Sequence, residues 1–330
     1  MRYLVTGGCG FIGSALIRKI GNSSRNHILN IDKLTYAGNL ASIPENLKGN
    51  YKFIKLDLAN YNELSKVVYN YKPDIIINFA AESHVDRSIE NSKPFISSNI
   101  LGVYNLLEAA RRLFSTYTHA RKRNFRLIQI STDEVYGDIP KHKMSKETDQ
   151  HLPNSPYAAS KSASDQLVRA WSQTYSLPTI TTHCCNNFGP YQMPEKLIPL
   201  IILNALEHKK LPIYGNGKQI RDWIHVDENI DILLKIIIKA DINEHYNISS
   251  ENSFRNIDLV KLICQILDRI YPSCKLSSYK KLITKVADRP SHDKRYSLNS
   301  GKLYKLIGKR KKYDFSKQLE STIMWYANNE

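Results

Sequence analysis

The stretch "VTGGCGFIGS", residues 5–14, joins a short apolar run to an amphipathic segment. Its glycines Gly7, Gly10 and Gly13 are spaced as G-x-x-G-x-x-G. Glycine permits a tight turn, lets backbone amides approach a diphosphate, and allows a helix to pack closely on a strand. The stretch therefore predicts a strand, a turn and a helix that together bind the diphosphate of a dinucleotide.

A carboxylate follows at the position that such a site uses for the adenosine ribose. Asp32 lies nineteen residues after Gly13, at the end of the next apolar run. There a carboxylate accepts hydrogen bonds from the ribose hydroxyls and repels a 2′-phosphate. The predicted cofactor is therefore NAD rather than NADP.

Short β-branched apolar runs alternate with amphipathic segments through the first half of the chain. We expect strands at 3–6, 27–31, 51–56, 74–80, 125–131 and 177–185. This alternation is typical of a parallel sheet covered by helices on both faces. The predicted fold class is α/β, a Rossmann-type doubly wound parallel sheet with a smaller C-terminal α/β substrate domain.

The alternation loosens after residue 186. We expect loops at 188–199 and 212–223, mixed with helices such as 256–270. These features predict an NAD-binding Rossmann domain over 1–185, to which later segments return, and a mainly substrate-binding domain over 186–330. The second domain is expected to close over the carboxyl ends of the strands, where α/β proteins bind their ligands.

The charge balance indicates an acidic ligand. Among 330 residues, 47 Lys and Arg oppose 31 Asp and Glu, which gives a formal charge of +16. The positive charges are scattered, with local concentrations only at 120–126 and 308–312, and neither alternates with aromatic residues. We therefore expect no nucleic-acid partner, because nucleic acids bind to contiguous basic surfaces and stacking aromatics.

Cysteine, histidine and hydropathy patterns exclude several other classes. The five cysteines form no C-x-x-C pair, which favours reduced thiols. His84, His225 and His292 are far apart and lack the spacing of a metal-binding motif, so no metal is expected. No leader-like segment and no apolar run of membrane-spanning length occurs, so we expect a cytoplasmic protein without a membrane partner.

The stretch "YAASK", residues 157–161, places Tyr157 and Lys161 four residues apart. On a helix they lie on one face, so the ammonium group can favour the phenolate. A phenol needs such help to act as a base near neutral pH. With the upstream hydroxyl of Thr132, the pair indicates a dehydrogenase-type site.

Two neighbouring carboxylates follow that hydroxyl in "STDEVYG", residues 131–137. In a continuing strand Asp133 and Glu134 would point to opposite faces of the sheet. We therefore predict that the strand ends by about Ser131 and that a turn begins at Asp133. Carboxylates in one site push their pKa values apart, so one can stay protonated while the other stays ionised.

The glycine run, Thr132 and the Y-x-x-x-K pair together resemble the extended short-chain dehydrogenase/reductase superfamily. Seven longer stretches resemble the nucleoside-diphosphoglucose 4,6-dehydratases within it, and they cover nearly the whole chain. They are "NIDKLTYAGNL" (30–40), "AAESHVDRSI" (80–89), "STDEVYGD" (131–138), "SPYAASKSASDQLVRAW" (155–171), "NNFGPYQMPEKLIP" (186–199), "PIYGNGKQIRDW" (212–223) and "ADRPSHDKRY" (287–296).

This resemblance implies a reaction, dehydration of dTDP-glucose in deoxysugar (rhamnose-type) biosynthesis. NAD oxidises the sugar at C4, water leaves across C5 and C6, and the hydride returns to C6. By the same resemblance Asp133 protonates the leaving O6 hydroxyl and Glu134 abstracts the C5 proton. Tyr157 takes the proton of the C4 hydroxyl, and Thr132 hydrogen-bonds that oxygen.

The resemblance also implies the residues of the site, among which two arginines suit a diphosphate because each planar fork engages paired oxygens. The implied catalytic residues are Thr132, Asp133, Glu134, Tyr157 and Lys161. The implied NAD-binding residues are Gly7, Gly10, Phe11, Ile12, Gly13, Asp32, Lys33, Leu34, Thr35, Asp57, Leu58, Ala80, Ala81, Ser83, Ser98, Tyr157, Lys161 and Asn187. The implied substrate-binding residues are His84, Thr132, Asn186, Lys196, Leu197, Pro212, Ile213, Tyr214, Arg221, Asn256, Arg289 and His292.

Relatives in this family pair as homodimers through two long helices, for which 92–114 and the helix carrying Tyr157 are the candidates here. The chain departs from the family pattern at Cys9, at Cys185, at Ser291 in place of a glycine, and in a short 137–156 segment. Ser291 is expected to tighten the loop under the nucleotide, and the short segment to leave the rim near the active site more open.

Three other functions remain open from the sequence. UDP-glucose is an alternative substrate, because one methyl group discriminates by only about 1 to 3 kcal/mol. A nucleotide-sugar 4-epimerase would share NAD and Y-x-x-x-K but would not need Asp133 and Glu134. An NAD-sensing regulator or RNA-binding protein would use the positive charge without catalysis, and it would not need the catalytic residues.

Overall fold

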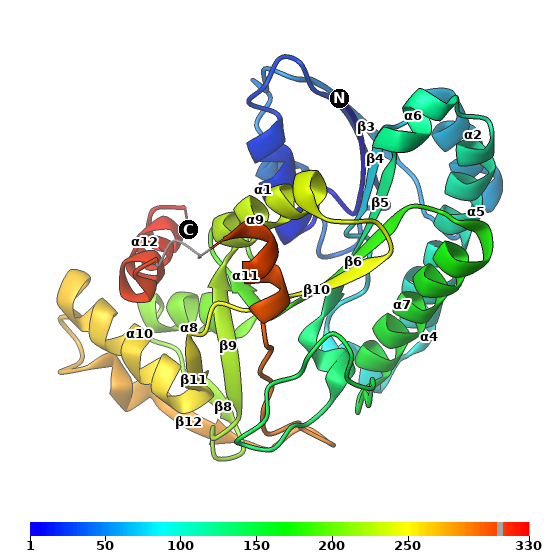
Figure 1. The fold of residues 1–330 in the computed structure, drawn as a ribbon. Coiled ribbons are helices and arrows are strands. Elements are labelled where there is room, and N and C mark those ends of the chain that lie inside the picture. Colours follow the sequence, from blue (N-terminus) through cyan, green and yellow to red (C-terminus); the bar gives the residue numbers. More distant parts are fainter. Residues whose placement is uncertain (309–312, 330) are drawn as a thin grey trace.

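The computed structural model describes residues 1–308 and 313–329, so the basic residues 309–312 lie outside the described residues. Seven parallel strands form the central sheet in the order β3-β2-β1-β4-β5-β6-β10 (Figure 1). They are β1 (Arg2–Thr6), β2 (His27–Asp32), β3 (Asn50–Lys55), β4 (Ile75–Asn78), β5 (Arg126–Thr132), β6 (Thr179–Cys184) and β10 (Glu244–Ile248). This order confirms the predicted Rossmann-type sheet.

The first six strands confirm the predicted ones, with small differences at their ends. Every residue of β4 and β6 is buried, because helices cover both faces of a parallel sheet. The seventh strand, β10, was not predicted. Its sequence "EHYNI" is half polar, and it is a strand because it pairs in register with β6 at the sheet edge.

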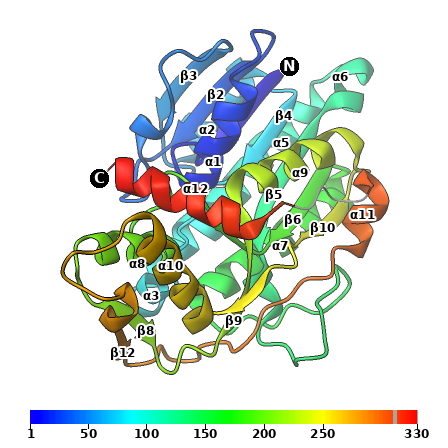
Figure 2. The ribbon, with the colours of Figure 1, turned by 90° about the vertical axis from the view of Figure 1, so that its left-hand side faces the viewer.

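Helices cover the two faces of the sheet in two groups (Figures 1 and 2). Tyr3 and Val5 of β1 pack toward α1 (Phe11–Ile20), α9 (Val226–Lys239) and α11 (Gly301–Ile307). Leu4 points the other way, toward α2 (Tyr61–Tyr71), α5 (Gly102–Ser115) and α7 (Pro156–Tyr175). Two of the covering helices, α9 and α11, thus come from the second half of the chain.

A third hydrophobic cluster holds the C-terminal part together. It lies among α8 (Leu197–Leu206), α10 (Asn256–Ile270), α12 (Phe315–Asn328) and two small sheets. The sheets are β11 (Ser253–Arg255), β9 (Ile220–His225) and β7 (Asn186–Phe188), and β12 (Ile283–Val286) with β8 (Leu211–Tyr214). The predicted loop at 212–223 is therefore partly wrong, since β8 and β9 occupy both of its ends. The predicted helix 256–270 is confirmed.

Short helices connect β4 to α5 along the edge of the site. These are α3 (Val85–Glu90), α4 (Lys93–Phe95) and a π-helical segment, Ile96–Leu101, which continues into α5. In the π segment, Asn99 hydrogen-bonds both backbone groups of Glu82 and donates to the hydroxyl of Ser160. The helix α6 (His119–Asn124) precedes β5.

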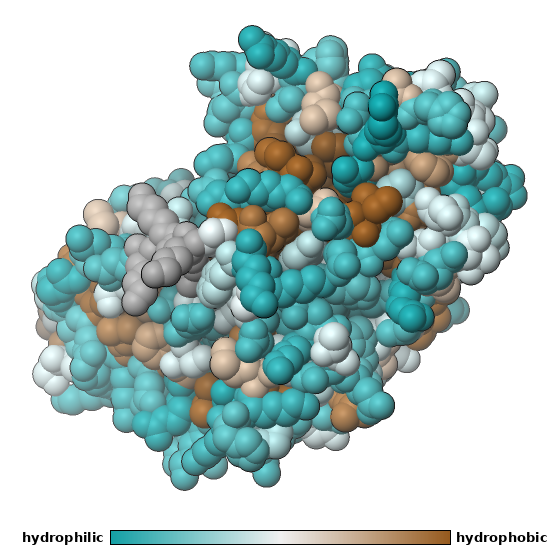
Figure 3. All heavy atoms as spheres, viewed as in Figure 1, coloured by the Kyte–Doolittle hydropathy of each residue, from teal (hydrophilic) through white to brown (hydrophobic). Residues whose placement is uncertain are grey.

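The outer surface is mostly hydrophilic in the view of Figure 3, where hydrophobic residues form small separate patches. Searched for membrane spans, residues 1–308 and 313–329 contain no helix that is both long and apolar enough to cross a bilayer.

Candidate active site

Two adjoining cavities lie at the carboxyl ends of the parallel strands. The larger, of about 360 Å³, follows β1, β2, β4 and β5, and the smaller, of about 290 Å³, extends beneath the C-terminal part. Both are lined by Ser83, Glu134, Asn186, Glu195, Lys196, Leu197 and Trp223. The shared wall makes them one continuous site at the point where the strand order reverses, between β1 and β4.

The glycine turn after β1 leaves no room for side chains. Gly7 has a φ of +68°, and a Cβ there would lie 2.5 Å from the backbone nitrogen of Ala80. A Cβ on Gly13 would overlap the carbonyl of Gly7. The N-cap of α1, Gly10, forms no side-chain capping bond, so the first amides of this helix face the cavity and can bind an anion. This cradle fits the diphosphate of a dinucleotide.

Asp32 is fixed at the end of β2, on the wall of the larger cavity. Its Oδ2 accepts a hydrogen bond from the backbone N–H of Cys9 at 2.9 Å, and its Oδ1 accepts one from Leu34 at 2.8 Å. All the predicted NAD-binding residues line this cavity except Leu34. Leu34 has a φ of +56° and orients Asp32 through its backbone.

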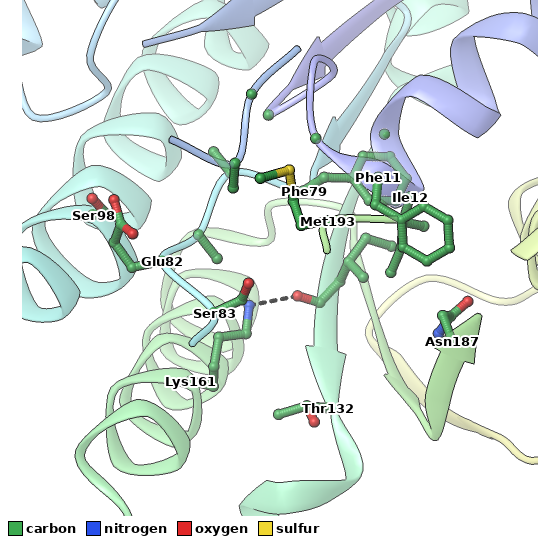
Figure 4. Close-up of a pocket in the computed structure, with 18 of the residues that line it drawn as sticks. Phe11, Ile12, Phe79, Glu82, Ser83, Ser98, Thr132, Lys161, Asn187 and Met193 are labelled. Carbon is green, nitrogen blue, oxygen red and sulfur yellow. Dashed lines mark hydrogen bonds between the residues drawn. The ribbon is translucent and has the colours of Figure 1, made fainter. Parts of the chain in front are cut away.

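The opposite side of the larger cavity carries a small polar cluster. Figure 4 shows Glu82 and Ser98 side by side, and the ammonium group of Lys33 lies 3.4 Å from the carboxylate of Glu82 and 2.6 Å from the hydroxyl of Ser98. Phe11 and Ile12, at the start of α1, cover the cavity from another side. The cavity therefore offers both apolar walls and fixed polar groups to an elongated ligand.

The strand β5 ends at Thr132, and a 3₁₀ turn begins at Asp133, as predicted within one residue. The hydroxyl of Thr132 caps this turn by accepting a hydrogen bond from the N–H of Glu134 at 3.3 Å. Because the strand stops here, Asp133 and Glu134 both face the larger cavity, and Glu134 also faces the smaller one.

The two carboxyl groups have different surroundings. Asp133 is only 2% exposed, and burial first and then Glu134 raise its pKa to about 8. Its Oδ2 has no hydrogen-bond partner among the described residues. Burial also raises the pKa of Glu134, but Arg221, Lys196 and Arg289 oppose this shift. Asp133 is therefore suited to donate a proton near neutral pH, and Glu134 lies where positive charges favour its ionised form.

Tyr157 and Lys161 lie in the first turns of α7, both buried and both facing the larger cavity. Figure 4 shows Lys161 reaching toward β5, where its Nζ donates to the carbonyl of Ile130 at 2.6 Å. Burial, and then the charge of Glu134, raise the pKa of Tyr157, and the hydrogen bond from Thr132 lowers it. Thr132 therefore favours the phenolate of Tyr157 in this structure, and the effect expected from Lys161 stays a prediction.

Two arginines face the smaller cavity and are held differently. Arg221 donates to the backbone carbonyls of Ile220 and Asp293 and stacks on the ring of Tyr296, 4.1 Å from its centroid. Arg289 instead forms a two-bond ion pair with Asp86. All the predicted substrate-binding residues line the smaller cavity except Thr132, which lines the larger one.

Several residues of the site were not predicted. Trp223 lies on the shared wall, and its buried indole N–H has no hydrogen-bond partner among the described residues. Glu195 shares that wall beside the predicted Lys196, and Asp86 lies in the quoted stretch 80–89 beside the predicted His84. The sequence signal for these residues was that each lies in a quoted stretch that also contains predicted substrate-binding residues.

The histidines fall into two groups. His84 and His292 line the smaller cavity, whereas His225 lines neither cavity. His151, Asp165 and His183 lie close enough to share an ion, with ligand atoms within 4.8 Å of one another. However, both ring nitrogens of His183 already have partners, Tyr136 and Asp165, so this group forms a buried hydrogen-bond network behind the site.

The departures from the family pattern are placed as follows. Cys9 is buried beside Asp32, and Cys185 is buried on the wall of the larger cavity. Ser291 has a φ of +48°, in the left-handed region that favours glycine, and it lines the smaller cavity. The 137–156 segment begins at Gly137, where a φ of +69° and the close carbonyl of Leu152 leave no space for a side chain.

The matching family profile and the similar known proteins are all described as 4,6-dehydratases of nucleotide sugars. Residues 4–322 match the sequence profile of the family described as GDP-mannose 4,6 dehydratase. The dTDP-glucose 4,6-dehydratase of Salmonella typhimurium is 48% identical over 339 residues, which cover 100% of this chain and 93% of that protein. The enzyme of the same name from Neisseria meningitidis serogroup B is 46% identical, covering 100% and 94%.

Solved structures give the same result. DesIV, a dTDP-glucose 4,6-dehydratase from Streptomyces venezuelae with NAD and TYD bound, superposes with a TM-score of 0.89 at 37% identity, covering 100% of this chain and 98% of that one. The dTDP-glucose 4,6-dehydratase of Bacillus anthracis in complex with NAD superposes with a TM-score of 0.87 at 38% identity, covering 100% and 97%. UDP-glucose 4-epimerase of Thermus thermophilus, at 24% identity and a TM-score of 0.86, shares the fold.

Proposed function

This chain belongs to the GDP-mannose 4,6 dehydratase family, and from this premise we propose that it catalyses the NAD-dependent dehydration of dTDP-glucose to dTDP-4-keto-6-deoxy-glucose. The observation that carries the proposal is the pair Asp133 and Glu134 at the junction of the two cavities. Burial raises the pKa of both carboxyl groups, that of Asp133 to about 8, and three cationic side chains oppose the shift at Glu134. An elimination needs an acid and a base at the same time, and this pair supplies both.

The larger cavity is the NAD site. Gly7, Gly10 and Gly13 bring the first amides of α1 to the diphosphate, and Asp32 receives the adenosine ribose. Bound NAD supplies the acceptor for a hydride from the sugar C4 and its return to C6. Lys161, on the same wall, orients the nicotinamide ribose through its ammonium group.

The chain's own residues move the protons. Tyr157 receives the proton of the C4 hydroxyl while Thr132 hydrogen-bonds that oxygen. Glu134 takes the C5 proton, which is acidic once C4 is a ketone. Asp133, which keeps its proton near neutral pH because of burial, gives it to the leaving O6 hydroxyl. These roles explain why the strand must end before Asp133.

The smaller cavity is the nucleotide-sugar site. Arg221 and Arg289 carry the positive charge for the diphosphate, and Lys196 lies between it and the catalytic residues on the shared wall. Residues 1–185 form the NAD-binding domain, joined by α9, β10 and α11, and the remainder of 186–330 forms the substrate-binding domain.

The quaternary state proposed for this protein is a homodimer that pairs through α5 and α7. Leu101, at the end of the π-helical segment, is 45% exposed, Tyr104 in the first turn of α5 is 42% exposed, and Tyr175 at the end of α7 is 45% exposed. Sedimentation of the wild type and of Tyr104→Glu tests it, since a charge in the interface should yield monomers. A reducing, cytoplasmic setting is proposed because all five cysteines are free thiols.

The decisive experiment incubates the purified protein with dTDP-glucose and measures product mass and the alkaline absorbance of a 4-keto-6-deoxy sugar. We expect the loss of one water per sugar, with UDP-glucose, run in parallel, converted more slowly. Unchanged mass with inversion at C4 would instead identify an epimerase. No reaction with either sugar would contradict the proposed function.

A further inference from the structure

One carboxylate connects three distant segments at the wall of the smaller cavity. Asp86 lies on α3, in the first half of the chain, and accepts bonds from Arg289 Nε at 2.7 Å and from Arg289 Nη2 at 2.9 Å. The hydroxyl of Tyr214, at the end of β8, donates to the same carboxylate at 3.2 Å. All three side chains line the cavity.

The geometry fixes the orientation of the guanidinium group. Both carboxylate oxygens engage one edge of the planar fork, which leaves no rotational freedom about the contact. Tyr214 is the second side chain beside the guanidinium group, and Arg289 Nη1 takes no part in the bonds to Asp86. Its N–H groups are therefore available to a ligand in the cavity.

The second arginine of the smaller cavity, Arg221, is held in a different way from Arg289. Arg221 is held by two backbone carbonyls and the ring of Tyr296, and no carboxylate lies within 4 Å of it in the described part of the chain. Arg289 lies on the loop after β12, 5.0 Å from the ring centroid of Tyr214, and its charge is paired by a carboxylate from the other half of the molecule. Ordering a free arginine costs side-chain entropy, so a partner that orders Arg289 before the ligand arrives favours binding.

We propose that Asp86 is a positioning residue, which holds Arg289 and Tyr214 in the arrangement that binds the diphosphate of the nucleotide sugar. The inference rests on the proposed function for the identity of the ligand. Asp86 stays paired when the ligand binds, because a displaced carboxylate would lose its charge-assisted hydrogen bonds while remaining close to a dianion. It acts on binding and not on the chemical step.

The test measures the dissociation constant of dTDP by calorimetry in the NAD-saturated protein, and KM and kcat for dTDP-glucose. Asp86→Asn should weaken dTDP binding and raise KM by about tenfold or more, since it removes charge-assisted hydrogen bonds. The kcat should stay within about threefold. Asp231→Asn is the matched control, because it removes the ion pair of Asp231 with Lys19, which also joins the two halves, outside both cavities.

A double-mutant cycle links the effect to Arg289. In the Arg289→Lys background, which already lacks the fork, Asp86→Asn should cause little further loss. If Asp86→Asn is too unstable to measure, the same cycle is run with Asp86→Glu. This variant keeps the charge and should recover part of the binding, so the cycle still tests the coupling to Arg289.

Several outcomes would overturn the inference: unchanged or tighter dTDP binding by Asp86→Asn, a loss of kcat with unchanged KM, or additive losses in the cycle. Failure of the proposed function is a separate result. It would appear as a wild-type protein that leaves dTDP-glucose unchanged, whatever the variants do to dTDP binding.

Discussion

The two cavities are built on different principles. The larger one is lined by turns that directly follow β1, β2 and β4, and backbone atoms approach closely there, those of Gly7 to Ala80 and those of Gly13 to Gly7. The smaller one is lined by side chains of both charges from segments far apart, as in the pair of Asp86 and Arg289. The larger cavity should therefore be sensitive to added atoms, and the smaller one to altered charge.

The largest effect is expected where the two cavities meet. Replacing the catalytic base by Glu134→Gln should lower kcat by about 10² to 10⁴, because the amide cannot abstract a proton. Binding of NAD and dTDP should change little. The measurement is the rate of water loss from dTDP-glucose, with Glu63→Gln on the exposed face of α2 as the control. Dehydration at the wild-type rate, also in the double variant Asp133→Asn with Glu134→Gln, would contradict the mechanism.

The backbone construction of the larger cavity is tested by Gly7→Ala. The new Cβ lies 2.5 Å from the Ala80 backbone. It also places a residue with a side chain at a φ of +68°, which favours glycine. We expect a loss of about 2 to 4 kcal/mol in the free energy of unfolding and NAD binding weakened by about 100-fold.

Gly308→Ala is the matched control for that variant, because Gly308 also has a positive φ, +79°, but no atom of residues 1–308 and 313–329 lies within 4 Å of the added Cβ. It should cost only about 1 kcal/mol and retain NAD. Thermal unfolding and the NAD content of the purified protein measure both effects. Equal behaviour of the two glycine variants would remove the argument that close packing builds this cavity.

Arg221→Lys tests whether the smaller cavity needs the shape of its charged side chains as well as their charge. The charge remains, but the fork and the stacking on Tyr296 are lost, so KM for dTDP-glucose should rise about 10- to 30-fold while kcat changes little. Arg269→Lys, in an exposed pair with Glu320, serves as control. A wild-type KM in Arg221→Lys would show that only net charge matters in this cavity.

The raised pKa of Asp133, at the junction of the two cavities, predicts how kcat and the melting temperature depend on pH. Because the acid form is needed, kcat should fall about tenfold per pH unit above about 8. The pKa of Asp133 in the folded protein lies above its ordinary value near 4. The neutral carboxyl therefore contributes to stability fully below about pH 4, and this contribution is lost as pH rises through about 8. The melting temperature of the wild type should therefore decline relative to Asp133→Asn over this range. Parallel melting curves would contradict the raised pKa.

The smallest effect is expected at Ser291 in the wall of the smaller cavity. Its φ of +48° disfavours any residue with a Cβ, so Ser291→Gly should raise the free energy of unfolding by at most about 1 kcal/mol. Ser291→Ala keeps the Cβ and should gain nothing, which separates the backbone effect from the loss of the hydroxyl. Chemical denaturation measures both variants. A stabilised Ser291→Ala would point to the hydroxyl instead.

The same contrast explains what the sequence could predict. Gly7, Gly10, Gly13 and Asp32 are close in sequence to the strands that place them, so the glycine run and the apolar alternation predicted the sheet and the position of the dinucleotide. The polar edge strand β10 escaped prediction because its neighbour β6, and not its own pattern, makes it a strand.

Contacts across the chain escaped prediction for a related reason. The pairing of Asp86 with Arg289 spans 203 residues, and nothing in one sequence indicates that these two charges meet. The hydrogen bond from Lys161 to the carbonyl of Ile130 depends on the packing of α7 against β5, which no sequence motif indicates. The catalytic and binding roles of the site residues remain predictions, whose positions are now known.

The π-helical segment Ile96–Leu101 has a consequence for how the chain can tolerate insertions and deletions. A π turn holds one more residue than an α turn between the same two ends. Deleting a single residue there would let an ordinary α-helix form between the same two ends, with Gly102–Ser115 unchanged, so the side chains inside the segment are the ones that would change direction. Ser98 and Asn99 would then face away from Lys33 and Glu82. Length, and not composition, is thus the property that selection must preserve in this segment.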